Sequence, residues 1–388
     1  MPTELASLLV AEGHDVDVVN IAWDLPMDTP YGPVMTNDGV RVIIVPPRAI
    51  TGMGQFVYRA SKWLASPWFA TRKIKRDIDP ENYDVVVGWT PCATLGGALS
   101  HVLKNSSAKK VLYVYDFFPI HHMEIGLIPK GPIYRIAKAI EDAFTRKFDV
   151  IFCNLPGNME YLRRNYPLRP EQDVRWTPLW TSIKPLPAAD RDQIRRQYGL
   201  RTDTVIAVFG GQITEGRGIE RMIEAAHRAR SEGKAVDFVF AGAGRLAPLV
   251  QQAAAIEGSN IYYLPHVPRE NFLQLVGACD LGLAVTVPEA SSFSFPTKSM
   301  DYLRAGIPVV LSVEPGNDYA GIITDNKVGV SVPMGDDEAF YEAIIGLAAD
   351  EPRRRAMAAN TRPTLERVFD VRHGYRRLID AVEGRPAS

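Results

Sequence analysis

The stretch that decides the fold runs from Val208 to Ile219 and reads VFGGQITEGRGI. An apolar strand pattern leads into this glycine-rich turn, and a helical pattern of apolar residues starts at Ile219. A strand, a glycine turn and a helix in succession are typical of a parallel α/β domain. Glycines let backbone N–H groups approach a phosphate, and Arg217 in this turn is placed to bind a diphosphate through its guanidinium fork. The same turn also fits a tight connection in which glycine only relieves strain.

Outward from this turn, short apolar runs alternate with helix-length amphipathic segments over the whole chain. Near-continuous apolar strands, each followed by a helix, indicate parallel sheets buried on both faces. So many strands suit two doubly wound domains better than one. The strands that we expect are Val16–Ile21, Val40–Val45, Asp84–Trp89, Lys110–Tyr115, Asp149–Asn154, Val205–Phe209, Val236–Ala241, Asn260–Leu264, Asp280–Val285, Ile307–Leu311 and Gly329–Val332.

The boundary between the two domains is expected in a proline-rich segment. Residues 176–187 hold three prolines and show no periodicity, which predicts a linker near 180–188. We therefore expect an N-terminal domain over 1–182, a C-terminal domain over 188–368, and a last helix within 369–388 that crosses back to the first domain. The chain opens on a helical pattern, so we also expect the first strand of the N-terminal domain to be missing.

The composition of the 388 residues is that of an ordinary globular protein, with 46% hydrophobic residues and a formal net charge of −1. This balance gives no electrostatic argument for nucleic acid as a partner. The three cysteines, Cys92, Cys153 and Cys279, are scattered and favour a reducing, cytoplasmic location. No apolar run reaches the roughly 18–20 residues that span a bilayer.

A second motif lies at Phe295–Val310 and reads FPTKSMDYLRAGIPVV. We expect a helix with Thr297 as its N-cap and Lys298 in its first turn, where an ammonium and free N–H groups can share one anion. Asp301, one turn on, can accept hydrogen bonds from ribose hydroxyls. A well-capped surface helix explains the same residues without any ligand.

A third glycine motif resembles a dinucleotide-binding turn only in its letters. Gly242–Ala247 matches G-x-G-x-x-A after a strand, but the next strand, within 260–265, ends without the acidic residue that a dinucleotide site requires. We therefore do not expect NAD. The turn still follows a strand of the same sheet, so its loop is expected at the same carboxyl edge as the other two motifs.

Together, this ordered series resembles the C-terminal domain of glycosyltransferase family 4, a GT-B-fold group of retaining nucleotide-sugar transferases. The helix at 296–302 resembles the P-S-K-x-x-E-Y helix of capsule and O-antigen transferases. In the N-terminal half, Tyr115–Pro119, Glu124–Ile128 and Phe152–Leu162 resemble segments of the same subgroup. The resemblance implies two Rossmann-like domains that face a cleft.

The resemblance also implies site residues. Those expected to bind the nucleotide-sugar are Gly210, Gly211, Gln212, Arg217, Gly242, His266, Val267, Ser294, Phe295, Thr297, Lys298 and Asp301. Those expected to take part in catalysis are Asp116, His121, His122, Arg217 and Lys298.

The chain departs from the family pattern at four of its positions. Phe293 stands where the first glutamate of the family's E-x(7)-E pair would be, and Asp301 replaces the second. Gln212 replaces an arginine, and Asp116 falls about where many members carry a histidine.

The expected activity is retaining, metal-independent transfer of a sugar from a nucleoside-diphosphate-sugar, a UDP-sugar by preference, to a glycan or lipid-linked acceptor in cell-surface polysaccharide synthesis. No cofactor and no metal ion are expected. Two alternatives stay open: a nucleotide-sugar 2-epimerase on the same fold, and a catalytically degenerate nucleotide-sugar-binding subunit.

A separate segment, Arg48–Arg76, contains seven basic residues, no acidic one and five interleaved aromatic residues. Basic-aromatic amphipathic segments fit an anionic membrane surface, which would make the protein peripheral on the cytoplasmic membrane. A core helix with a solvated basic face is the other interpretation.

Overall fold

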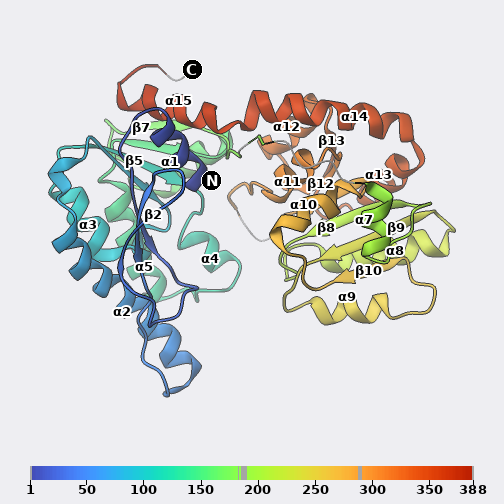
Figure 1. The fold of residues 1–388 in the computed structure, drawn as a ribbon, viewed down its shortest axis with the longest axis horizontal. Helices are drawn as coiled ribbons and strands as arrows, with labels where there is room; N and C mark the ends of the chain where they lie inside the picture. The colour runs from blue at the N-terminus through green and yellow to red at the C-terminus, as the bar shows by residue number, and fades with distance from the viewer. Residues whose placement is uncertain (1, 182, 185–189, 287–290, 387–388) are drawn as a thin grey trace. The chain divides into compact units, whose positions relative to one another are not determined.

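The computed structural model describes residues 2–181, 183–184, 190–286 and 291–386. The chain forms two compact units (Figure 1). The first unit comprises residues 1–180 and 371–388, and the second comprises residues 181–370. The unit boundaries fall at 180/181 and 370/371, whereas we expected the N-terminal domain to end at 182 and the C-terminal domain to run from 188 to 368.

The second unit is built on one sheet of six parallel strands in the order β10-β9-β8-β11-β12-β13. From β8 the chain builds outward through β9 to β10, and β11 then returns to the other side of β8. The order of the strands therefore reverses between β8 and β11, and open α/β sheets bind ligands beyond the carboxyl ends of their strands at such a switch point. The strands are β8 (Val205–Gly210), β9 (Val236–Ala241), β10 (Ile261–Leu264), β11 (Leu281–Val285), β12 (Val309–Val313) and β13 (Gly329–Pro333).

Helices cover both faces of this sheet and bury its strands, as the apolar runs predict. Phe209, Phe238 and Phe240 are buried with Ile219 and Met222 of the helix that follows the glycine turn. The helices are α7 (Arg191–Gln197), α8 (Ile219–Ser231), α9 (Ala247–Ala254), α10 (Arg269–Gly277), α11 (Lys298–Arg304), α12 (Asp318–Asp325), α13 (Asp337–Ala349) and α14 (Glu351–Thr364), with a π-helical turn at Leu365–Phe369.

The first unit contains two sheets. Four parallel strands have the order β4-β5-β6-β7, and three more have the order β1-β3-β2, in which β2 runs antiparallel. The strands are β1 (Asp17–Ile21), β2 (Gly32–Met35), β3 (Arg41–Val45), β4 (Val85–Trp89), β5 (Lys109–Val114), β6 (Val150–Cys153) and β7 (Asp173–Trp176). Strands β1 and β4 are edge strands, each paired on one side only.

Two of these strands were not expected from the sequence. Strand β2 reads GPVM, carries a glycine and a proline, and lies at a sheet edge with mostly exposed residues, so no apolar pattern marks it. Strand β7 ends at Trp176, the first residue of the proline-rich segment 176–187, and the sequence analysis placed no strand there. The antiparallel β2 is also an exception to the all-parallel sheet that the sequence predicted.

The helices of the first unit include both ends of the chain. Helix α15 packs against α1, and Leu378 of α15 is buried in one cluster with Leu5 and Trp180. The Trp180 ring lies so close to Gly374 that a Cβ there would be 2.8 Å from it. The C-terminal helix thus belongs to the first unit. The helices are α1 (Pro2–Ala11), α2 (Gly54–Asp77), α3 (Gly96–Lys104), α4 (Ile120–Glu124), α5 (Pro132–Thr145), α6 (Pro156–Asn165) and α15 (Val371–Val382), with short 3-10 turns at Pro80–Asn82 and Cys92–Thr94.

Of the helices described, including the 24-residue α2, none combines the length and the apolar character needed to cross a bilayer.

Candidate functional site

The glycine turn after β8 packs directly on the turn after β9. Gly211 donates its N–H to the carbonyl of Ala241 at 2.8 Å, and Gly242 and Gly244 adopt φ values of +148° and +157°. A Cβ on Gly242 would overlap the carbonyl oxygen of Gly211. The glycines of the two turns therefore have a packing role, which is the interpretation without a ligand, and this packing brings the turns together at one end of the sheet.

Helix α8 starts from this turn with Gly218 as its N-cap in the left-handed conformation, at φ +67°. A side chain at this position would also meet Val285, at the end of β11. Gly218 therefore allows the turn that carries Arg217 to lie against the neighbouring strand, at the switch point.

Helix α11 begins at Lys298, as expected, but its start is not fixed in the expected way. Thr297 is the N-cap residue, as expected, but it has helical backbone angles and makes no side-chain capping bond. An N-cap side chain needs an extended backbone to reach the first free N–H groups. Ser299 fixes the turn instead, since its hydroxyl donates to the carbonyl of Pro296 at 2.6 Å and bonds with the hydroxyl of Tyr319.

Tyr302 ties α11 to both strands of the switch point. Its buried hydroxyl accepts a hydrogen bond from the N–H of Gly210 at 3.1 Å and donates one to the carbonyl of Leu283 at 3.0 Å. The ring packs where any side chain on Gly282 would overlap it. The position of Lys298 relative to the glycine turn is therefore fixed by hydrogen bonds to the strands on both sides.

Lys298 and Arg217 form a pair of cations at this place. The Lys298 ammonium lies 4.7 Å from the centre of the Phe209 ring, and its Cε would be 2.6 Å from a Cβ on Gly211. Burial, and to a smaller extent the charge of Arg217, lowers the pKa of Lys298 to about 8. Burial also lowers the pKa of Arg217.

Neither cation has an acidic partner among the residues that the structure describes. Two neighbouring cations with part of their hydration removed cost free energy, and a bound anion would offset that cost. The arrangement is thus suited to an anion of two or more charges, held between the turn after β8 and the start of α11.

The other residues expected at the nucleotide-sugar site lie around the same sheet edge with different surroundings. Gln212 is exposed and Gly210 is buried at the end of β8. The carbonyl of Ser294 accepts from Asn317 at 2.9 Å, and the carboxylate of Asp301 lies 3.8 Å from Arg304. These contacts neither assign nor exclude a role in binding.

Phe295 and the pair His266 and Val267 were also predicted to bind the nucleotide-sugar, and their surroundings differ. The Phe295 ring packs on the Tyr319 ring at 4.6 Å between centres, so this side chain contributes to packing. His266 and Val267 follow β10, which lies two strands away from β8, and His266 is exposed.

Asp116, His121 and His122 lie together in the first unit, after β5. The Asp116 carboxylate is 3.4 Å from Nδ1 of His122, and the two histidine rings are 6.1 Å apart. The hydroxyl of Thr90 accepts from the N–H groups of Tyr115 and Asp116, which holds the start of this loop against the turn after β4. The half-exposed cluster offers polar groups that can orient a hydroxyl-bearing molecule.

Glu141 supports this cluster and was missed by the sequence analysis. It is fully buried on α5, and its carboxylate accepts from the N–H groups of Cys92 and Ala93 at 2.8 and 2.9 Å. Burial raises the pKa of Glu141 to about 7. An acidic residue on the buried side of an amphipathic helix was the available signal. Its role is to hold the turn that carries Thr90.

Within the described part of the chain, no group of three or more His, Cys, Asp or Glu side chains is placed to hold a metal ion.

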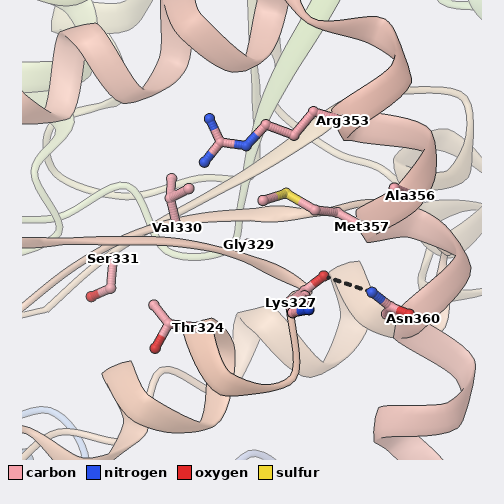
Figure 2. A pocket seen from close by; sticks show the side chains of 9 residues that line it. All are labelled: Thr324, Lys327, Gly329, Val330, Ser331, Arg353, Ala356, Met357 and Asn360. Atoms are coloured by element: carbon pink, nitrogen blue, oxygen red, sulfur yellow. Dashed lines mark hydrogen bonds between the residues drawn. The ribbon is translucent and has the colours of Figure 1, made fainter.

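A cavity of about 510 Å³ lies elsewhere in the second unit, between α12, α14 and the free edge of β13 (Figure 2). Lys327, Ser331, Arg353 and Met357 are among its lining residues, and the amide of Asn360 closes one side by donating to the carbonyl of Lys327 at 3.2 Å. None of the residues predicted for the site lines this cavity.

Two family models match the chain. Residues 3–178 match Glycosyltransferase Family 4, and residues 190–364 match Glycosyl transferases group 1. A curated relative is the putative colanic acid biosynthesis glycosyl transferase WcaI of Escherichia coli, which is 23% identical over 98% of this chain and 95% of its own length.

Solved structures agree in fold. Sucrose-phosphate synthase from Thermosynechococcus elongatus is 18% identical, with a TM-score of 0.72 over 97% of this chain and 92% of its own. Anabaena HepE in complex with UDP-glucose is 15% identical, with a TM-score of 0.65 over 89% of this chain and 87% of its own. Since the two family models follow each other along the chain and both units have the expected Rossmann-like architecture, the chain is a glycosyltransferase of the GT-B type, made of a glycosyltransferase family 4 domain followed by a group 1 domain.

Proposed function

We propose that this protein transfers a sugar, with retention of configuration and without a metal ion, from a UDP-sugar to a glycan or lipid-linked acceptor during cell-surface polysaccharide synthesis. The observation that carries the proposal is the pair Arg217 and Lys298, two partly buried cations at the switch point with no acidic partner among the described residues. The diphosphate of a nucleoside diphosphate supplies negative charge that would offset these two positive charges.

Two relatives support the choice of donor and pathway. HepE is described in complex with UDP-glucose, and WcaI is named for colanic acid biosynthesis. Both properties belong to those proteins, and they bear on this chain through the fold shared with HepE and the sequence similarity to WcaI over nearly its whole length.

In the proposed reaction, the bond between the anomeric carbon and the diphosphate breaks as the acceptor hydroxyl forms its bond on the same face of the sugar. The leaving diphosphate gains negative charge, which Arg217 and Lys298 stabilise. The departing phosphate oxygen takes the proton of the acceptor hydroxyl, so no protein base is required. Asp116, His121 and His122 of the first unit orient the acceptor or the sugar.

An assay of sugar release tests this proposal against its two alternatives. Purified protein is incubated with UDP-sugars, with and without lipid extract as a source of acceptor, and free UDP, free sugar and interconverted UDP-sugar are measured. The proposal expects UDP release that depends on the extract. Interconversion without an acceptor would identify an epimerase, and binding without turnover would identify a degenerate subunit.

The pH dependence of UDP binding follows from Lys298. Its pKa is lowered to about 8 in the free protein, whereas a bound diphosphate restores the charged form, so binding above pH 8 requires uptake of a proton. We expect affinity to fall by up to about tenfold per pH unit above pH 8. Calorimetric titration near pH 7 and pH 9 measures this. Equal affinities at both values would contradict it, and a Lys298→Met protein should lose the decline.

We also propose that α2 contacts an anionic membrane through one face, because its two faces differ. Ala70 and Ile74 are buried, whereas Trp68 is 60% exposed with Arg72 stacked on its ring at 4.9 Å. Other cations of the segment point into the protein, since Arg48 and Lys62 donate to backbone carbonyls. The core-helix interpretation therefore holds for one face, and the exposed face keeps the aromatic and basic character that suits a membrane.

Sedimentation with vesicles containing phosphatidylglycerol tests this surface. Reversing the charge of Arg72 together with Trp68→Ala should weaken binding by at least about tenfold, since each cation near such a surface contributes about 1 kcal/mol. Arg355→Glu, on the exposed side of α14, is the matched control. Equal sedimentation of all three proteins would contradict the proposal.

A further inference from the structure

Glu314 has a buried carboxylate at the carboxyl end of the sheet, and only one of its two oxygens has a hydrogen-bond partner among the described residues. It follows β12 directly and is 7% exposed. Its Oε2 accepts from the amide of Asn317 at 2.8 Å. Its Oε1 is buried and has no hydrogen-bond partner among the described residues. Leaving a buried charged oxygen without a partner costs free energy, so such an atom calls for an explanation.

The surroundings hold this carboxylate rigidly. Asn317 donates its N–H to the carbonyl of Glu314 at 3.1 Å, and its side-chain oxygen accepts from the N–H of Tyr319. The side-chain amide of Asn317 is thereby oriented to donate both to Glu314 and to the carbonyl of Ser294. Glu314 is thus fixed to the segment that leads into α11 and Lys298.

The turn that begins at Glu314 also lies near Phe293, the position at which the sequence lacks an expected glutamate. Phe293 stands where the resemblance led us to expect the first glutamate of a pair, and a Cβ on Gly316, in the turn after Glu314, would be 3.8 Å from the Phe293 ring. The turn after β12, which begins at Glu314, therefore lies near the aromatic ring at position 293.

The charge of Glu314 limits what it can bind. A carboxylate oxygen accepts hydrogen bonds and repels phosphate, so it does not bind the diphosphate that the cations hold. The hydroxyl groups of a neutral sugar are the matching donors. A sugar that carries its own carboxylate would place like charges together.

We propose that Oε1 of Glu314 accepts a hydrogen bond from a ring hydroxyl of the donor sugar and selects a neutral hexose over a uronic acid. This assignment rests on the proposed nucleotide-sugar function and names the residue that recognises the sugar. Glu314 acts on the sugar part of the donor only, so the nucleotide alone does not sense it.

The test compares nucleotide and nucleotide-sugar binding by calorimetry. UDP is titrated first, and then UDP-glucose, UDP-galactose, UDP-N-acetylglucosamine and UDP-glucuronate, into the wild-type protein, Glu314→Gln and the control Glu342→Gln, an exposed residue of α13. We expect UDP to bind all three proteins equally. Glu314→Gln should bind the best neutral UDP-sugar about 10–100-fold more weakly, the range for a hydrogen bond to a charged group, and should discriminate less against UDP-glucuronate.

Each outcome of this titration supports or contradicts the assignment of Glu314. If Glu314→Gln binds UDP and every UDP-sugar as the wild type does, the assignment is wrong. If it loses UDP and UDP-sugar affinity equally, Glu314 has a structural role only and the assignment is again wrong; a lowered melting temperature would accompany this. If the wild-type protein binds neither UDP nor any UDP-sugar, the proposed donor itself fails, and the assignment fails with it.

Discussion

Replacing Lys298 with alanine is expected to lower the rate of sugar transfer by about 10²–10³-fold, the range for the loss of one group that stabilises developing negative charge. The ammonium lies over Gly211 and the Phe209 ring, where no acidic residue described in the structure competes for it. Since this charge is poorly solvated in the free protein, its removal should leave the melting temperature unchanged or raise it slightly. Steady-state release of UDP and thermal unfolding measure the two effects.

Two matched variants separate the charge of Lys298 from its packing. Lys298→Met keeps the length of the side chain and its contact with Phe209, and it should be as inactive as the alanine variant. Lys327→Ala, an exposed lysine that follows α12, should transfer sugar at the wild-type rate. Activity in Lys298→Met close to that of the wild type would show that packing, and no anion, explains the position of Lys298.

Replacing Arg217 with alanine is expected to have an effect of the same size, about 10²–10³-fold. Arg217 projects from the turn before α8, and its charge lowers the pKa of Lys298. The variant should therefore also raise the pKa of Lys298 and move the pH dependence of UDP binding upward. Both signatures follow from one anion shared by two cations, so the double variant should be less impaired than the product of the single effects.

The control for this second variant is Arg245→Ala. Arg245 lies in the neighbouring turn, is 79% exposed and pairs with Glu215. Its loss should change the rate by less than about fivefold, because exposed pairs contribute about 0–1 kcal/mol. If Arg217→Ala and Arg245→Ala transferred sugar at the same rate, Arg217 would have no specific role in binding the diphosphate.

The sequence predicted the second unit well because its strands are buried on both faces. Strand β8 was expected at Val205–Phe209 and is Val205–Gly210, and the glycine turn and α8 follow as expected. Strand β2 was missed because a short edge strand buries little and needs no apolar pattern. The separate β1-β3-β2 sheet was not predictable either, since strand pairing is set by tertiary packing rather than by local sequence.

The candidate site was predictable only in part. Arg217 and Lys298 stand in motifs that show their place on a turn and at a helix start, so their proximity followed from the order of the strands. Glu314 and Glu141 stand in no motif. Both are buried and bonded to distant segments, which happens only in the folded chain. Glu314 is linked to Ser294 by way of Asn317, and Glu141 accepts a hydrogen bond from Cys92.

The most direct test of the account is nucleotide binding by the wild-type protein and by the double variant Arg217→Ala/Lys298→Ala. Calorimetric titrations with UDP, GDP and ADP at neutral pH are sufficient. We expect UDP to bind the wild-type protein and to bind the double variant at least about 100-fold more weakly, as the loss of two charge-assisted contacts requires. Unchanged affinity for UDP in the double variant, with the fold intact, would contradict the assignment of these two cations to the donor diphosphate.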